Sequence, residues 1–356
     1  AGAPVAEEAV AAENVAFLRW LKSDHFVFLG ARDYDYPRAE DGDYEAEAPL
    51  SQSGEGLGVL RDPERRVLRR GNEPAVLTRQ MRRQMDLSEP VTVAKANLRS
   101  RVHRRAYMDY IGVKKYGPDG RASGETRFVG LFTAEAYDHV AAEVPLIRRK
   151  VAGVLARADK APGSHNEKRL RNILDNYPRD ELFQITEDEL LSISLGVLHL
   201  YDRPRIRIFT RQDPFDRFVS VLLFVPRERF NTDMRHRIEA LLREALSADH
   251  VESHVAMGDS PLAQLHMIVR PRGDASEERF DIDALEKALA ETVRNWHDNL
   301  NDLLVSRHGD GGFNAVALRE LRHAITRQDE WIEARRAAVE ACPSSDPDSV
   351  LEQRFL

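Results

Sequence analysis

Strand-like alternation of hydrophobic and polar positions dominates the first third of the chain. The stretch 91–133 holds three apolar or alternating runs, separated by a basic connector and by the turn sequence Gly117-Pro118-Asp119-Gly120. Glycine and proline at such a turn supply the backbone angles that a hairpin needs. Two earlier runs have the same character. We predict five strands of one largely antiparallel sheet, at 25–36, 57–60, 91–96, 107–116 and 125–133.

The apolar spacing changes from about two to about 3.6 residues after Thr133, which indicates helices. A stripe of valine, isoleucine and leucine from Val140 to Leu155 predicts one long helix. The sequences Ser164–Glu167 and Thr186–Glu189 are capping boxes, in which the hydroxyl accepts the third backbone N–H and the carboxylate reaches back. Two further helices are expected to begin there.

A second sheet follows these helices in the order ββαββα. We predict strands at 205–209, 218–225, 250–256 and 262–270, and helices from about Thr232 and over 282–303. The return strand 218–225 is almost continuously apolar, which predicts burial on both of its faces. A glycine-rich break at 309–312 precedes a charged helix.

These patterns predict an α+β fold made of two antiparallel-sheet modules joined by a helical connector. A short amphipathic helix at 14–24 opens the first module. The predicted domains are a first sheet module at 14–133, a helical connector at 134–203, a ββαββα module at 204–307 and a helical or irregular tail at 308–356.

Composition narrows the functional classes. The net charge of −7 over 356 residues argues against nucleic acid as the main partner, because phosphate binding normally needs a basic excess. Cys342 is the single cysteine, which excludes an internal disulfide and a thiolate zinc site and fits a reducing, cytoplasmic setting. The sequence has no apolar run of about 18 residues, so we expect no membrane span. It begins without methionine, as a piece of a longer protein would.

Catalytic and cofactor motifs are missing from the sequence. The run Gly54–Gly58 has the wrong spacing for a dinucleotide fingerprint and precedes a strand. The twelve histidines are scattered, and for any one of them, such as His199 or His266, a structural role is favoured over a ligand role. We therefore predict no catalytic, cofactor-binding or metal-binding residue in this chain.

The basic connector is the densest cluster of charge. It could clamp a carboxylate or phosphate, hold an acidic face of a neighbouring domain, or be a solvated link between strands. Stacking of single-stranded nucleic acid on Tyr107 and Tyr110 is the least favoured alternative. We predict docking of another domain or subunit on Lys95, Arg99, Arg101, His103, Arg104 and Arg105.

Nine segments together resemble one family, the large bacterial NAD-specific glutamate dehydrogenases, whose subunits are far longer than this chain. The segments occur in the family's order between about Asn14 and Leu304. They read FVFLGARDYDY, GLGVLRD, KANLRSRVHRRAYMDYIGVK, GETRFVGLFT, PLIRRKV, GSH, NILDNYPRDELFQI, DPFDRFVSVLLFVPRERFNT and SPLAQLHMIVR. The tail after about Asn301 does not follow the resemblance.

The resemblance implies a PAS-like identity for the module at 14–133 and an ACT-like identity for the module at 204–307. ACT-like modules commonly bind amino acids at a loop between a strand and a helix, often across a subunit contact. By position alone, this implies an effector site; the same residues also read as ordinary turn and cap residues. The residues concerned are Arg211, Asp213, Asp216, Asn231 and Thr232.

The resemblance also implies a function. Because a nicotinamide-binding fingerprint is missing, the expected role is a non-catalytic regulatory or assembly segment, with NAD used elsewhere in the parent enzyme. Expected partners are the remainder of the dehydrogenase subunit, like subunits and an amino-acid effector. A free-standing amino-acid sensor and a purely architectural oligomerisation segment are the alternatives.

Overall fold

The computed structural model describes residues 3–38, 43–45, 51–65, 67–68, 79–87, 89–215, 217–257, 260–272 and 282–293. The chain divides into two compact units, Ala1–Val293 and Arg294–Leu356, and every described residue lies in the first. The predicted tail at 308–356 and the end of the predicted closing helix lie outside the described residues.

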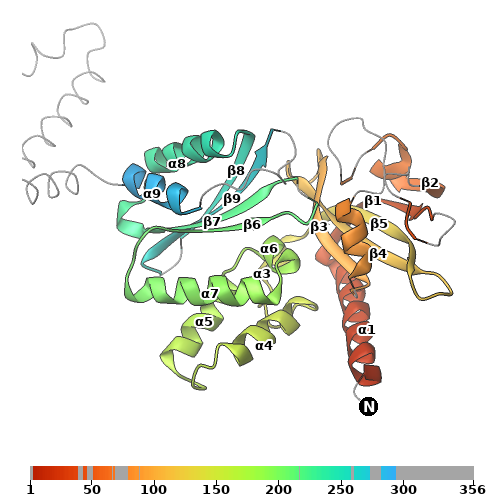
Figure 1. Ribbon diagram of the computed structural model, residues 1–356, viewed down its shortest axis with the longest axis horizontal. Coiled ribbons are helices and arrows are strands. Elements are labelled where there is room, and N and C mark those ends of the chain that lie inside the picture. The colour runs from red at the N-terminus through yellow and green to blue at the C-terminus, as the bar shows by residue number, and fades with distance from the viewer. Residues whose placement is uncertain are drawn as a thin grey trace, which may run out of the picture. The chain divides into compact units, whose positions relative to one another are not determined.

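A five-stranded antiparallel sheet forms the first module, as predicted (Figure 1). The prediction of its second strand at 57–60 is wrong: that strand spans residues 51–58, and a left-handed φ of 58° at Gly58 turns the backbone into a 3-10 turn. Its strands are β1 (Phe26–Asp35), β2 (Ser51–Gly58), β3 (Val91–Arg99), β4 (Tyr107–Tyr116) and β5 (Ala122–Phe132). The strand order is β2-β1-β5-β4-β3. Helix α1 (Ala3–Trp20) and the π turn η1 (Leu21–His25) lead into β1, while η2 (Val59–Arg61) follows β2 and α2 (Arg79–Asp86) precedes β3.

The helical connector contains α3 (Ala134–Asp138), α4 (Ile147–Arg157), α5 (His165–Asp175), α6 (Arg179–Gln184) and α7 (Glu187–Asp202). The prediction of a helix from Val140 is wrong: α4 begins only at Ile147. Pro145 explains the late start, because proline disfavours helical backbone at the residue before it and lacks an N–H. Leu146 has a left-handed φ of 69°, and Val140 is exposed rather than part of a buried stripe.

Helix caps follow the sequence closely. Thr186 and Glu189 form the complete capping box at the start of α7. At α5 the Ser164 hydroxyl accepts the Glu167 N–H, but the Glu167 carboxylate accepts from the N–H of Gly163 rather than of Ser164. The predicted capping box at Ser164 is therefore incomplete, because its return hydrogen bond comes from the residue before the N-cap.

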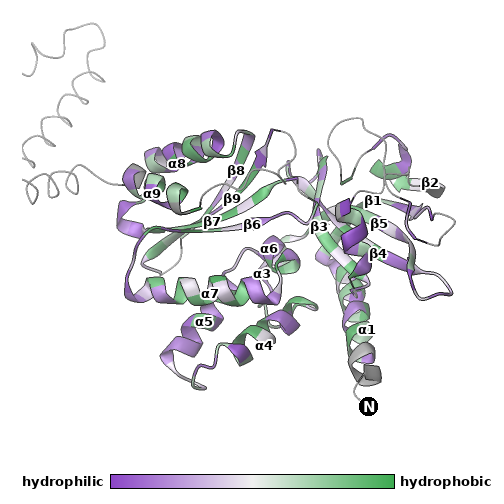
Figure 2. Cartoon of the chain, in the orientation of Figure 1, coloured by the Kyte–Doolittle hydropathy of each residue, from purple (hydrophilic) through white to green (hydrophobic). Residues whose placement is uncertain are grey.

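The second module has the predicted ββαββα order in a four-stranded antiparallel sheet, β6-β7-β9-β8. Its elements are β6 (Arg207–Gln212), β7 (Val219–Pro226), η3 (Arg227–Arg229), α8 (Thr232–Ala245), β8 (Ala248–Ala256), β9 (Leu262–Pro271) and α9 (Ile282–Val293). Hydrophobic residues run along β7 and β9, whereas α4, α7 and α8 alternate between hydrophobic and hydrophilic residues (Figure 2).

Strand β7 is buried along its whole length, which confirms the prediction from its apolar run. Val221 and Leu223 pack in one core with Ile238 of α8 and Leu285 of α9. The alternate residues Leu222 and Phe224 belong to a different core that also contains helices α4 to α7 and one face of the first sheet. The second sheet thus lies between helices on both faces, and the first sheet, the connector and the second sheet share a continuous core.

Candidate functional site

A cleft of about 400 Å³ lies where β3, helix α6 and strands β8 and β9 meet. Its lining carries both signs of charge together with aromatic rings, including Lys95, Tyr107, Asp180, Glu181, His254 and Arg270. Ligand pockets in proteins are typically of this size, with a few placed polar groups. The cleft is therefore the best candidate for a functional site among the described residues.

Glu181, which lines the cleft, belongs to a buried ion pair between α6 and β6. Arg211 donates from Nε and Nη2 to the Glu181 carboxylate, at 2.7 and 3.0 Å. The His266 Nε2 atom lies 3.6 Å from the same carboxylate and 3.1 Å from the Ser220 hydroxyl. Burial raises the pKa of Glu181, but the charge of Arg211 and the contact with His266 outweigh it, so the pKa lies well below its usual range. Glu181 is therefore ionised at neutral pH.

A second buried cluster joins the first sheet to α6. The Lys95 ammonium lies 2.6 Å from an Asp109 oxygen and 2.7 Å from an Asp180 oxygen, so two carboxylates share one cation. Burial raises the pKa of Asp109 to about 6, Lys95 opposes that shift, and the Asp180 carboxylate adds to it. Burial also acts on Lys95, but the two carboxylates hold the pKa of its ammonium well above the usual value.

Tyr137 and Arg104 link the Lys95 cluster to the protein surface through hydrogen bonds. The Tyr137 hydroxyl donates to Asp180 at 2.7 Å, and Arg104 donates to that hydroxyl at 3.1 Å. Also in the lining of the cleft, the Arg270 guanidinium lies 3.8 Å from the centre of the Tyr107 ring. Cation–π contacts of this kind hold planar groups face to face. The lining of the cleft therefore contains a stacked guanidinium together with carboxylates that are paired with cations.

The structure divides the predicted basic connector into two groups. Lys95, Arg99 and Arg104 contact other elements of this chain, Arg99 through Glu252 of β8 at 3.5 Å. Arg101, His103 and Arg105 are exposed. Docking on an absent domain therefore stays a prediction for the exposed group, whereas the first group ties the modules of this chain together.

Two residues of the predicted effector site are engaged within the fold. Arg211 is paired with Glu181, as described above. Asp213 accepts the N–H groups of Phe215 and Arg217 at 3.1 and 3.2 Å, and the Arg217 guanidinium at 2.7 and 2.8 Å. Asp213 therefore holds the β6–β7 turn.

Asn231 and Thr232, two further predicted effector residues, lie at the far end of the second sheet. In the register of β6 and β7, Arg211 lies opposite Ser220 at the start of β7. Asn231 and Thr232 instead follow the end of β7. With a rise of about 3.3 Å per residue, the two ends are about 20 Å apart. Asn231 caps α8 by accepting the Met234 N–H at 2.8 Å. Asp216 lies outside the described residues, so one site built from all five residues stays a prediction.

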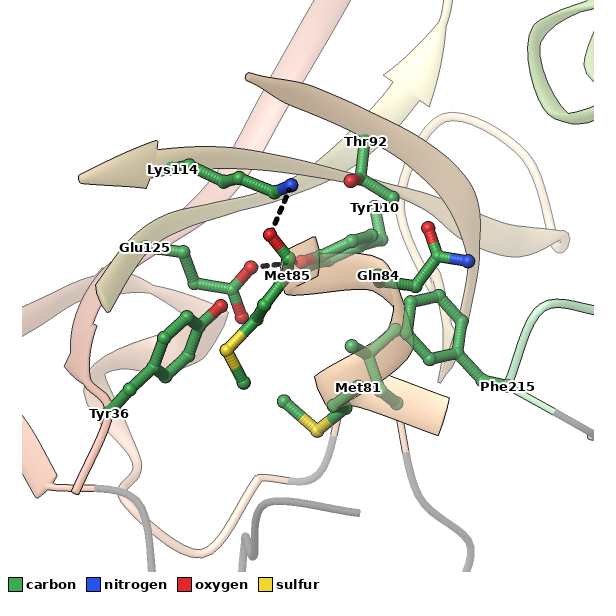
Figure 3. Close-up of a pocket in the computed structure, with 10 residues that line it drawn as sticks. Tyr36, Met81, Gln84, Met85, Thr92, Tyr110, Lys114, Glu125 and Phe215 are labelled. Carbon is green, nitrogen blue, oxygen red and sulfur yellow. Dashed lines mark hydrogen bonds between the residues drawn. The ribbon is translucent and has the colours of Figure 1, made fainter. Parts of the chain in front are cut away.

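A small cavity of about 10 Å³ lies against the other face of the first sheet (Figure 3). The Glu125 carboxylate accepts from the Tyr110 hydroxyl at 2.6 Å and from Arg127, and Lys114 donates to the Met85 carbonyl at 3.1 Å. Burial and the Glu125 charge raise the pKa of Tyr110 well above its ordinary value. A space this small holds about one water, so this cluster is structural.

Sequence reasoning missed Glu181 and Asp180, and it predicted only a structural role for His266, which contacts Glu181 and Ser220. The two carboxylates sit in the segment NILDNYPRDELFQI, where they read as first-turn helix residues, and their partners are distant in sequence.

No helix among the described residues is long and apolar enough to cross a membrane.

The fold and the cleft define an α+β protein in which an ACT-like sheet is locked to a helical motif. Residues 207–297 match the family model for the glutamate dehydrogenase ACT2 domain, and residues 144–203 match the model for glutamate dehydrogenase helical motif 1. The ACT-like prediction for the second module is thereby confirmed.

The chain is also similar to segments of three NAD-specific glutamate dehydrogenases. It is 37% identical to the protein of Halomonas elongata over 307 residues, which cover 86% of this chain and 19% of the relative. The Pseudomonas aeruginosa protein is 35% identical over 85% of this chain and 18% of the relative. The Mycobacterium tuberculosis protein is 32% identical over 80% of this chain and 17% of the relative. The chain thus spans less than a fifth of the length of these relatives.

Proposed function

We propose that the chain is a non-catalytic regulatory and assembly segment from the N-terminal part of a large NAD-dependent glutamate dehydrogenase. The parent enzyme would convert glutamate and NAD to 2-oxoglutarate, ammonium and NADH in the cytoplasm. The matches to the ACT2 domain and helical motif 1, and the similarity over 86% of this chain but 19% of a relative, support this proposal. The five-stranded antiparallel order of the first sheet supports its PAS-like identity.

The observation that carries the proposal is how the matched parts are joined. Glu181 lies in the part that matches helical motif 1, and Arg211 lies in the part that matches the ACT2 domain, so their buried ion pair crosses the boundary between them. Lys95 and Asp180 cross the boundary between the first sheet and the helical motif in the same way. A charge left buried without its partner is strongly destabilising, so these pairs favour one fixed arrangement of the parts within their shared core. The segment is therefore suited to act as a rigid body.

Docking onto the rest of the subunit is assigned to the exposed part of the basic connector. We expect Arg101→Glu with Arg105→Glu to weaken association between this chain and the separately produced remainder of a parent subunit, measured by sedimentation velocity. Charge reversal replaces attraction by repulsion at that contact and should make it less sensitive to salt.

The matched control is Arg237→Glu with Arg243→Glu, which reverses two exposed arginines on α8. Unchanged association of the connector variant, or an equal loss with the α8 variant, would contradict docking through the connector.

A second candidate function, amino-acid sensing, is favoured by the cleft rather than by the five predicted loop residues. A zwitterion needs a cation for its carboxylate and an anion for its ammonium, and the cleft offers Arg270 and Arg104 together with Glu252 and Asp180. Its volume of about 400 Å³ accommodates a molecule of that size.

Calorimetry with a panel of amino acids tests this function. One saturable signal is expected, and Ala256→Phe should abolish it because Ala256 lines the cleft and a phenyl group fills the space. Ala245→Phe, which places the same group on the exposed side of α8, should leave the signal intact. No signal with any amino acid would leave the architectural function as the only role of this segment.

A further inference from the structure

The histidine pair His25 and His139 forms the clearest cluster of metal-ligating side chains outside the cleft. Their Nε2 atoms lie 3.2 Å apart although the residues are 114 positions apart in sequence. The Glu135 carboxylate lies 4.0 Å from the His139 Nε2 atom. Two nitrogens that each bind tetrahedral zinc at about 2.0–2.1 Å lie about 3.3 Å apart, so the histidine spacing already fits such an ion.

The fold brings these three residues together through strand register. Phe26 of β1 pairs with Phe132 of β5, and just beyond this pair the Thr133 N–H donates to the His25 carbonyl at 3.0 Å. Thr133 is also the N-cap of α3, which carries Glu135 in its first turn and has His139 as its C-cap. The positions of all three candidate ligands therefore follow from one strand pair and one helical turn.

Hydrogen bonds around the pair orient the ring nitrogens. The His25 Nδ1 atom lies 2.8 Å from the Trp20 carbonyl, so Nδ1 carries the proton and Nε2 presents a lone pair. Metal-binding histidines are held by this kind of bond from the second ring nitrogen. Arg179 donates to the His139 carbonyl at 2.6 Å and holds the backbone of the second ligand.

We propose that His25, His139 and Glu135 bind a divalent first-row transition metal, with zinc as the best fit to two imidazoles and one carboxylate. Without metal, the His139 Nε2–H donates to the His25 Nε2 lone pair. Binding replaces that hydrogen bond by two metal–nitrogen bonds, and the displaced proton is replaced by one at Nδ1 of His139, which keeps the imidazole neutral. The exposed Glu135 side chain needs only a rotation to become the third ligand, and a tetrahedral ion keeps one position for water.

Trp20 reports directly on this site. Its ring stacks on the His25 ring, with centroids 4.4 Å apart, and meets the His139 ring edge-on at 6.4 Å. In the Trp296→Phe, Trp331→Phe background, Trp20 is the only tryptophan of the chain. A paramagnetic ion bound between the histidines is therefore expected to quench its fluorescence.

The test titrates chelator-treated full chain with Co²⁺ and Zn²⁺. One ion per chain is expected at micromolar or lower concentration, with Trp20 quenching by Co²⁺ that added Zn²⁺ reverses. His139→Gln should weaken binding by at least about tenfold, since even loss of a supporting residue has that effect. Glu135→Gln, at an exposed position, should weaken binding with unchanged unfolding of the metal-free chain.

The matched control is His236→Gln, because His236 also lies beside a glutamate, with Nδ1 3.6 Å from Glu239, but belongs to an exposed helix face. Binding that survives His139→Gln, or that falls equally with His236→Gln, would overturn the site, as would the absence of a saturable one-to-one signal.

Discussion

Lys95 is the cation that two carboxylates share where the first sheet meets α6. Its ammonium serves Asp109 and Asp180 at once, so the buried cluster has one more negative charge than positive charge before Arg104 and Tyr137 are counted. Two carboxylates that share a site cannot both ionise easily, and one of them takes up a proton at unusually high pH. In this chain that carboxylate is Asp109, whose pKa is raised to about 6 chiefly by burial, with the Asp180 charge adding to the rise.

The free energy of unfolding should therefore depend on pH through Asp109. Its folded-state pKa of about 6 exceeds the unfolded value of 3.8, so the folded chain binds more protons between these values. The contribution of the group is full below the unfolded value and is lost as pH rises through the folded one. Between pH 7 and pH 5 the wild type should gain on the order of 1 kcal/mol relative to Asp109→Asn, measured by urea unfolding.

Lys95→Gln provides the companion variant. Removal of the ammonium leaves Asp109 without its cation and should shift the pH-dependent window upward. A stability difference between wild type and Asp109→Asn that stays constant from pH 5 to pH 7, or that changes in the opposite direction, would contradict the shared-cation interpretation.

Glu181→Gln should destabilise the chain strongly. The substitution leaves Arg211 buried without a counter-charge, and breaking a buried pair by removing one partner costs about 3–5 kcal/mol. The side chains of Glu181 and Arg211 are only 5% and 4% exposed, which justifies the buried value. The exposed pair of Asp249 and Arg272 is the control, and Asp249→Asn should cost less than about 1 kcal/mol. Equal costs in denaturant unfolding would show that the buried pair has no special role.

Helix α7 begins at the most complete cap in the described residues, and its stability depends on it. Thr186→Ala removes the side-chain bonds to Glu189 and should lower the free energy of unfolding by about 1 kcal/mol. Thr232→Ala is a close control, because Asn231 rather than Thr232 caps α8. A loss for Thr232→Ala as large as that for Thr186→Ala would mean that the cap assignments are wrong.

Strands and caps were predictable because their causes are local. Alternation at 107–116 and the apolar run before Pro226 depend on neighbours two residues away, and both strands appear as predicted. The helix expected from Val140 failed for a local reason as well, since Pro145 interrupts a stripe that otherwise has helical spacing. The short strand expected at 57–60 is displaced to 51–58 without any proline, because the left-handed φ of Gly58 ends the strand there.

Contacts between elements that are distant in sequence could not be predicted from the sequence alone. The helical connector packs against both sheets in a continuous core, and the cleft is created by that packing. Lys95 meets Asp180 and His25 meets His139 only after β3, α6, β1 and α3 have been placed. The sequence indicated the charge of the basic connector, whereas its acidic partners Asp109, Asp180 and Glu252 lie on β4, α6 and β8.

Glutamate-dependent formation of NADH is the most direct test of the central claim that this chain is a non-catalytic segment of a large NAD-dependent glutamate dehydrogenase. The assay compares the purified chain with a full-length parent subunit at equal molar concentration. NADH should form only with the full-length subunit. Saturable, glutamate-dependent NADH formation by the purified chain would contradict the account.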